Sequence, residues 1–92
     1  MRDKAEFIVE LGGIEDIAAF ASAFNSSFIR LAGGEWNGRS WDAFNDYLSW
    51  PDEDEFRLVL RGWKSCQALA ETDREIFEEI IRDNPHVEAV YA

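Results

Sequence analysis

The chain has 92 residues, of which 19 are acidic and nine are basic, so its formal net charge at pH 7 is −10. That charge repels the phosphates of nucleic acids and anionic membrane surfaces, and it attracts a basic protein over long range. Because 47% of the residues are hydrophobic, we expect one folded domain over residues 1–92 and not a disordered chain.

The cysteine count and the N-terminus predict the compartment. Cys66 is the only cysteine, so no intramolecular disulfide can form, which is typical of a reducing environment. Residues 1–13 lack the apolar core and small-residue cleavage site of a signal peptide, and no apolar run approaches the length of a membrane span. We therefore expect a cytoplasmic protein.

The first half of the chain predicts a strand followed by two helices. Residues 6–11 alternate apolar and mostly polar side chains, as a strand does, and Gly12 and Gly13 end them. From Glu15 the apolar residues fall at helical spacing, and we expect that helix to end within residues 25–27. Residues 28–38 contain three glycines and predict mainly a loop. Ser40 is placed to cap a second helix that Pro51 closes.

The second half predicts two more strands with helices between them. Residues 51–55 form a charged connection, and residues 56–60 are apolar enough for a central strand. Residues 61–71 predict a turn and a short helix. Thr72 and Glu75 have the spacing of a capping box before an amphipathic helix that Asn84 and Pro85 end, and residues 87–92 predict the last strand. Strands separated by helices imply an α/β fold with a small parallel sheet of three strands packed with helices.

Motifs of enzymes and of metal sites are missing from the sequence. His86 is the only histidine, and nothing in its spacing from Cys66 supports a catalytic pair. Neither a zinc-ligand spacing nor a phosphate-binding glycine loop occurs, and the acidic run 52–55 lacks the spacing of a calcium loop. We therefore expect no enzyme activity, no metal and no cofactor.

The second predicted helix carries an unusual acidic side. Asp42 and Asp46 lie four residues apart, so they share one helical side, about 40° apart. Two carboxylates can serve acid–base catalysis, but that requires a desolvated carboxyl in a deep cleft. A solvated helix side is the simplest interpretation of such a pair. Residues 40–56, however, hold six acidic and no basic residues beside several aromatics, which is typical of a docking surface for a basic partner.

Residues 36–48, WNGRSWDAFNDYL, resemble the helix-opening motif of the barstar family of ribonuclease inhibitors. The motif has an aromatic residue, a glycine, an apolar residue followed by Asp-Ala, and then an acidic residue before a leucine. The resemblance is specific there and generic over the remaining chain. It implies a three-stranded parallel sheet and a non-enzymatic inhibitor (an immunity protein) of a small basic ribonuclease. In that family an acidic helix and the loop before it block the nuclease active site, and carboxylates take the place of RNA phosphates.

The family motif assigns roles to individual residues. Asp46 matches the dominant inhibitory aspartate, and Asp42 matches the acid one turn earlier. A second acidic contact falls at Asp83, or at Glu79 if the alignment shifts. With the remaining outward positions of the helix, the expected partner-binding residues are Trp36, Gly38, Asp42, Asn45, Asp46, Ser49 and Asp83. Each also has a structural alternative: Trp36 could belong to the core, Asp42 to the first helical turn, and Asp83 to a solvated helix end.

Three positions depart from the family pattern. Asn37 and Asn45 stand where barstar has aromatic residues that contact the enzyme, and Arg39 stands where it has an acid. Arg39 could instead pair with Asp42 three residues later. These departures keep a second hypothesis open, namely an acidic protein-interaction or regulatory module that uses the same scaffold without a nuclease target.

Overall fold

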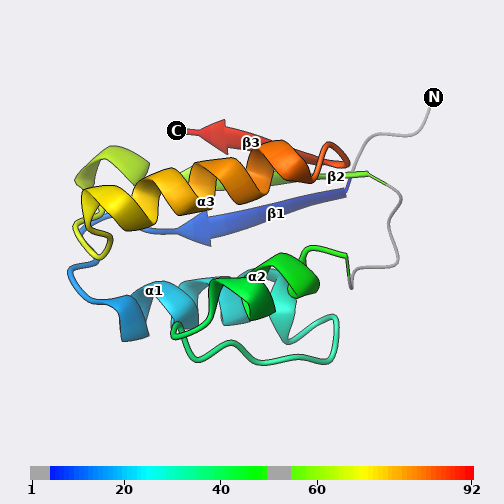
Figure 1. The fold of residues 1–92 in the computed structure, drawn as a ribbon, viewed down its shortest axis with the longest axis horizontal. Coiled ribbons are helices and arrows are strands. Elements are labelled where there is room, and N and C mark those ends of the chain that lie inside the picture. The colour runs from blue at the N-terminus through cyan, green and yellow to red at the C-terminus, as the bar shows by residue number, and fades with distance from the viewer. Residues whose placement is uncertain (1–4, 50–54) are drawn as a thin grey trace.

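The computed structural model describes residues 5–49 and 55–92, and in that part of the chain three parallel strands form one sheet (Figure 1). The sheet order is β1-β2-β3, so β2 is central. The elements follow one another as β1 (Ala5–Glu10), α1 (Ile17–Phe24), a π-helical turn (Asn25–Ile29), α2 (Trp41–Tyr47), β2 (Phe56–Arg61), a 3-10 turn (Trp63–Ser65), α3 (Glu71–Asp83) and β3 (Val87–Tyr91). This architecture confirms the predicted α/β fold.

The helices cover one face of the sheet only. Phe56, Leu58 and Leu60 of β2 are fully buried on that face, together with Val9 of β1. The residues between them on the strands point to the opposite face, where Glu6, Ile8 and Glu10 of β1 are all exposed. Alternation of this kind marks a sheet with one solvated face. No helix in the described residues is long and apolar enough to cross a membrane.

Ion pairs run across the solvated face of the sheet. Arg57 in the central strand lies between Glu6 and Glu88, with N–O distances of 3.2 and 3.3 Å. Hydrogen bonding to Glu6 and the charge of Glu88 raise the pKa of Arg57. Four residues further along the strands, Arg61 pairs with Glu10 at 2.6 Å. Exposed pairs of this kind add little stability, but they balance charge on a face that no helix covers.

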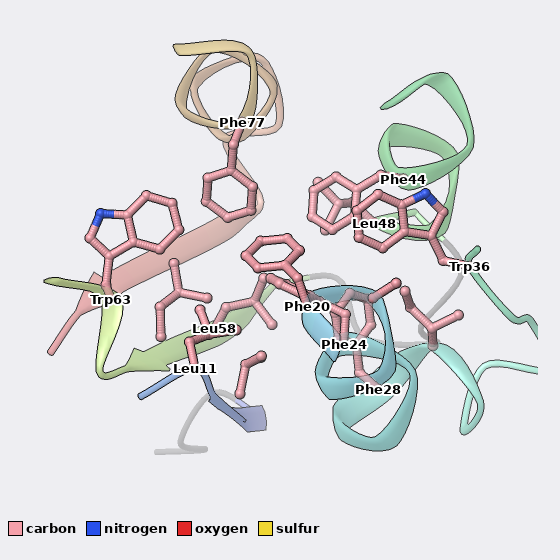
Figure 2. Close-up of a cluster of buried hydrophobic side chains, with 14 of the residues drawn as sticks. Leu11, Phe20, Phe24, Phe28, Trp36, Phe44, Leu48, Leu58, Trp63 and Phe77 are labelled. Carbon is pink, nitrogen blue, oxygen red and sulfur yellow. The ribbon is translucent and has the colours of Figure 1, made fainter. Parts of the chain in front are cut away.

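The core is an aromatic cluster in which α1, α2 and α3 meet (Figure 2). The ring of Phe24 on α1 lies 5.2 Å from that of Phe44 on α2 and 6.0 Å from that of Phe77 on α3. Phe44 and Phe77 lie 5.5 Å apart. Rings at these distances, mostly edge to face, add specific attraction to the burial of apolar area. The contacts of Phe44 with Phe24 and Phe77 therefore hold α2 in place against the other two helices.

The first helix is longer than the sequence predicts. It continues beyond residues 25–27 as a π-helical turn to Ile29, in which the Arg30 amide donates to the Asn25 carbonyl oxygen at 3.1 Å. Phe28 and Ile29 are buried, and burying both keeps the chain helical past the polar residues that predicted its end.

The predicted capping box is wrong. Helix α3 begins at Glu71 with Ala70 as its N-cap, and no side chain caps it. Thr72 therefore lies inside the first turn and not before it. Leu69, the residue before the N-cap, is buried in the core, so the chain is anchored by packing next to the start of this helix. The proposed stop at Pro51 lies outside the described residues, although α2 already ends at Tyr47.

Candidate partner-binding surface

Helix α2 presents one side to the core and the other to solvent. The Ser40 hydroxyl accepts a hydrogen bond from the Ala43 amide at 3.2 Å, which confirms the predicted cap. Phe44 and Leu48 are fully buried. The predicted outward residues Asp42, Asn45, Asp46 and Ser49 are all exposed. The capped start and the apolar spacing of the helix thus fix which side carries its carboxylates.

A groove of about 310 Å³ lies between α2 and α3. Its apolar wall is formed by Trp41, Ile76 and Ile80, and Asp42 lines it from α2. Glu79 and Asp83, the two candidates for the second acidic contact, line the groove from α3. The side-chain amides of Asn45 and Asn84 complete the lining. The structure therefore places Asp42, Asp83 and Glu79 around one groove, while Asp46 is exposed on α2 outside its lining.

Several outward side chains also make bonds within the protein. The Asn84 side-chain amide donates to Asn45 Oδ1 at 2.8 Å and to the Ile80 carbonyl oxygen at 2.7 Å, which joins the end of α3 to α2. The Ser49 hydroxyl donates to the Asp46 backbone oxygen at 2.8 Å. The carboxylate of Asp46, in contrast, has no hydrogen-bond or ion-pair partner among residues 5–49 and 55–92.

Trp36 belongs to the core and not to the exposed surface. Its side chain is 2% exposed, and its rings lie 4.9 Å from Phe44. The indole N–H donates to the Ser40 carbonyl oxygen at 2.8 Å, directly at the start of α2. The side chain thus has the core position given above as its structural alternative, and it supports the helix from below, while partner contact by Trp36 stays a prediction.

Gly38 is required by packing within the protein. Its φ angle is +80°, a conformation that side chains with a Cβ rarely adopt. A Cβ at this position would also lie 3.1 Å from Ile17 Cγ1 and 3.3 Å from the Ala21 Cβ. The close approach that this glycine permits is thus between the loop before α2 and helix α1.

Arg39 lies two residues before helix α2, next to the Ser40 cap. Its amide donates to Asn37 Oδ1 at 2.9 Å, which turns the backbone at this point. Its side chain is exposed, and in the described part of the chain its guanidinium forms no ion pair, so the alternative pairing with Asp42 is not present. Before the acidic helix there is therefore a guanidinium that pairs with no carboxylate of residues 5–49 and 55–92.

Cys66 and His86 cannot form a catalytic pair. Cys66 is buried beyond the C-terminal end of β2. His86 precedes β3, and the His86 backbone oxygen accepts a hydrogen bond from the amide of Phe56, the first residue of β2. The two residues thus lie at opposite ends of the sheet, about 20 Å apart for a six-residue strand. His86 Nε2 instead lies 2.9 Å from the Leu48 carbonyl oxygen. Within the described residues no group of three or more His, Cys, Asp or Glu side chains is placed to hold a metal ion.

Two asparagines shape this surface although the sequence gives little sign of their roles. Asn84 stands before a proline, a pattern that predicts only the end of a helix, and yet it joins α3 to α2. Asn25 is 4% exposed and bonds to the backbone of Trp36, 11 residues away. The only hint for Asn25 in the sequence is that a polar residue directly follows a series of apolar residues at helical spacing.

Comparison with protein families agrees with this geometry. The family model described as Barstar (barnase inhibitor) matches residues 4–88. Neither the curated proteins nor the solved structures returned a significant match. The matched range includes all three helices, the first two strands and the start of β3. With a parallel three-stranded sheet and an acidic helix in the predicted place, the chain belongs to the Barstar family.

Proposed function

We propose that this protein is a non-enzymatic inhibitor of a small basic ribonuclease, which it binds one-to-one in the cytoplasm and blocks at the active site. The observation that carries the proposal is a set of four exposed carboxylates on two neighbouring helices, Asp42, Asp46, Glu79 and Asp83. None of the four pairs with a cation among the described residues. The family match supports the same partner class.

Unpaired carboxylates on one surface favour a cationic partner for physical reasons. Like charges four residues apart on a helix repel each other by a few tenths of a kcal/mol, and a cation that binds between them removes this repulsion. An enzyme that cleaves RNA holds phosphates with arginine, lysine and histidine side chains. Carboxylates offer these side chains similar charge-assisted hydrogen bonds, and so they can occupy the phosphate sites.

The groove between α2 and α3 suits an arginine or lysine of the partner. Its apolar wall, formed by Trp41, Ile76 and Ile80, can contact the aliphatic stem, and the Trp41 ring can attract the cation. The carboxylates of Asp42 and of α3 then surround the charged end. A cation buried there would be paired on several sides, which is the arrangement that makes interfacial charge pairs favourable.

Inhibition of barnase tests the proposal directly, and its salt dependence tests the mechanism. We expect the association rate constant to fall about tenfold or more between about 0.05 M and about 0.5 M salt, because salt screens the long-range attraction. Stopped-flow mixing with barnase measures the rate, and circular dichroism in the same buffers checks the fold. An association rate that does not depend on salt would contradict electrostatic capture.

Arg39 should weaken binding to a basic enzyme. We expect Arg39→Glu to tighten the complex with barnase about fivefold, since an exposed charge pair contributes up to about 1 kcal/mol. Lys64→Glu is the matched control, because Lys64 is exposed on the 3-10 turn after β2 and the charge change is equal. Tighter binding in both variants would show a non-specific charge effect, and weaker binding only in Arg39→Glu would show that Arg39 faces an acid.

A second candidate function is an acidic interaction or regulatory module without a nuclease target. The guanidinium of Arg39, which forms no ion pair within the described residues, favours it, because a cation at the edge of a phosphate-mimicking surface opposes a basic enzyme. Affinity capture at low salt from the native host distinguishes the two functions. A captured basic protein that cleaves RNA supports the inhibitor, and a captured partner without ribonuclease activity supports the module.

A further inference from the structure

The loop of residues 35–40 is held in place although it contains no helix or strand. At its start, the Tyr47 hydroxyl donates to the Glu35 carbonyl oxygen at 2.8 Å. At its end, the Trp36 indole N–H donates to the Ser40 carbonyl oxygen at 2.8 Å. Between them, the Arg39 amide bonds to Asn37 Oδ1. The Tyr47 bond connects the loop to helix α2, the other two bonds lie within the loop, and a separate contact connects it to the helix before it.

That separate contact is a pair of buried hydrogen bonds made by Asn25. Its side-chain nitrogen donates to the Trp36 carbonyl oxygen at 2.8 Å, and its Oδ1 accepts from the Trp36 amide at 2.7 Å. Asn25 is 4% exposed and is the only buried polar residue in the described part of the chain. Because water is excluded, both bonds are stronger than they would be at the surface, and losing either leaves a buried group unsatisfied.

The backbone at Asn25 departs from a regular α-helix. Asn25 ends α1 and begins the π-helical turn, and its carbonyl oxygen accepts from the Arg30 amide five residues later. Single π-helical turns occur frequently at functional sites. Here the turn coincides with the residue whose side chain leaves the helix and reaches the loop. The irregular backbone and the buried bonds therefore mark the same position.

We propose that Asn25 is the positioning residue of the partner-binding surface. It fixes the backbone of Trp36, whose indole fixes the carbonyl of Ser40, and Ser40 caps α2. The carboxylates of Asp42 and Asp46 follow within the next two turns. This chain of contacts orders the loop and the start of α2 before a partner arrives, so that less ordering remains to be done on binding. The gain in binding rests on the proposed inhibitor function, whereas the ordering of the loop does not.

Hydrogen exchange of backbone amides tests the ordering without a partner. In Asn25→Ala, the Trp36 amide should exchange about tenfold faster or more, together with other amides of residues 36–43. Val87→Ala is the matched control, because it removes buried apolar contacts on β3 and leaves the loop intact. Equal acceleration of the Trp36 amide in the two variants, after normalising to amides of the sheet, would overturn the proposal.

Asn25→Asp gives a rescue test with nearly the same shape. At neutral pH the new carboxylate can accept from the Trp36 amide but repels the Trp36 carbonyl oxygen. When it is protonated, it offers one acceptor and one donor, as the amide does. Burial and the carbonyl raise the pKa of this carboxyl, so lowering the pH should bring the exchange of the Trp36 amide back toward wild type measured at the same pH. No recovery on acidification would contradict the paired hydrogen bonds.

Binding to barnase tests the functional part. We expect Asn25→Ala to raise the dissociation constant about tenfold, and Val87→Ala to leave it nearly unchanged. Equal losses in the two variants would show that Asn25 acts only through global stability and would overturn the positioning role. If the wild-type protein does not bind barnase, the inhibitor proposal fails, and the exchange experiments still decide whether Asn25 orders the loop.

Discussion

Replacing Asp46 with alanine should reduce inhibition of barnase by roughly 30-fold to several thousandfold while the fold persists. Removing one partner of a buried charge pair costs about 2–5 kcal/mol of binding free energy, because the cations of the other protein are left unpaired. The Asp46 carboxylate is exposed and makes no hydrogen bond or ion pair within the described residues, so its loss should not affect folding. Ribonuclease activity measured against inhibitor concentration gives the change in affinity.

Two further variants separate the local effect of Asp46 from the total charge. Asp46→Asn keeps the shape and removes the charge. Glu78→Gln removes one charge at a different place, next to Tyr91. Burial of Tyr91 and, to a smaller extent, the charge of Glu78 raise the pKa of the Tyr91 phenol, which locates Glu78 beside that strand. We expect a large loss of inhibition in Asp46→Asn and a small one in Glu78→Gln. If Asp46→Ala inhibits as well as wild type, the proposed surface is wrong.

Gly62→Ala should destabilise the protein by about 2–5 kcal/mol, which is a large share of the stability of a small domain. Gly62 follows β2 with a φ angle of +79°, which is unfavourable for alanine. A Cβ at this position would also lie 2.5 Å from the backbone N and Cα of Gly12, which follows β1. The backbones after the two strands would have to move apart to make room for it.

Gly13→Ala is the matched control for this effect. Gly13 has a similar φ angle of +76°, but a Cβ there would meet nothing within 4 Å. We therefore expect only the conformational cost of about 1–2 kcal/mol. Urea denaturation at constant slope measures both variants. Equal destabilisation by the two substitutions would mean that the contact with Gly12 relaxes without cost.

Much of the fold follows from local patterns in the sequence. The alternation in residues 6–11 and the apolar run 56–60 predict strands, and the structure has β1 and β2 in these places. Ser40 predicts the start of α2 because a serine cap acts over only three residues. The capping box at Thr72 failed because α3 starts earlier, at Glu71, without a side-chain cap and two residues after the buried Leu69. Local signals predict well where tertiary contacts do not compete with them.

The part of the site that depends only on the spacing of apolar residues along α2 could be predicted from the sequence. The spacing of Phe44 and Leu48 determines that Asp42 and Asp46 point outward, and both are exposed. Contacts between elements were not predictable. The bond from Asn84 to Asn45 joins residues 39 positions apart, and burial of Trp36 depends on how α1 and α2 meet. Such contacts arise only once the helices are packed, so no short stretch of sequence encodes them.

Helix α2 divides its two tasks between its two sides, and this division has an evolutionary consequence. Phe44 sits at the centre of the aromatic core, so almost any change at that position would harm folding. The exposed carboxylates on the other side contribute little to the core. A lineage could therefore replace them, or a neighbour such as Arg39, at small cost in stability. The binding surface could in this way change through a few outward residues while the scaffold is inherited intact.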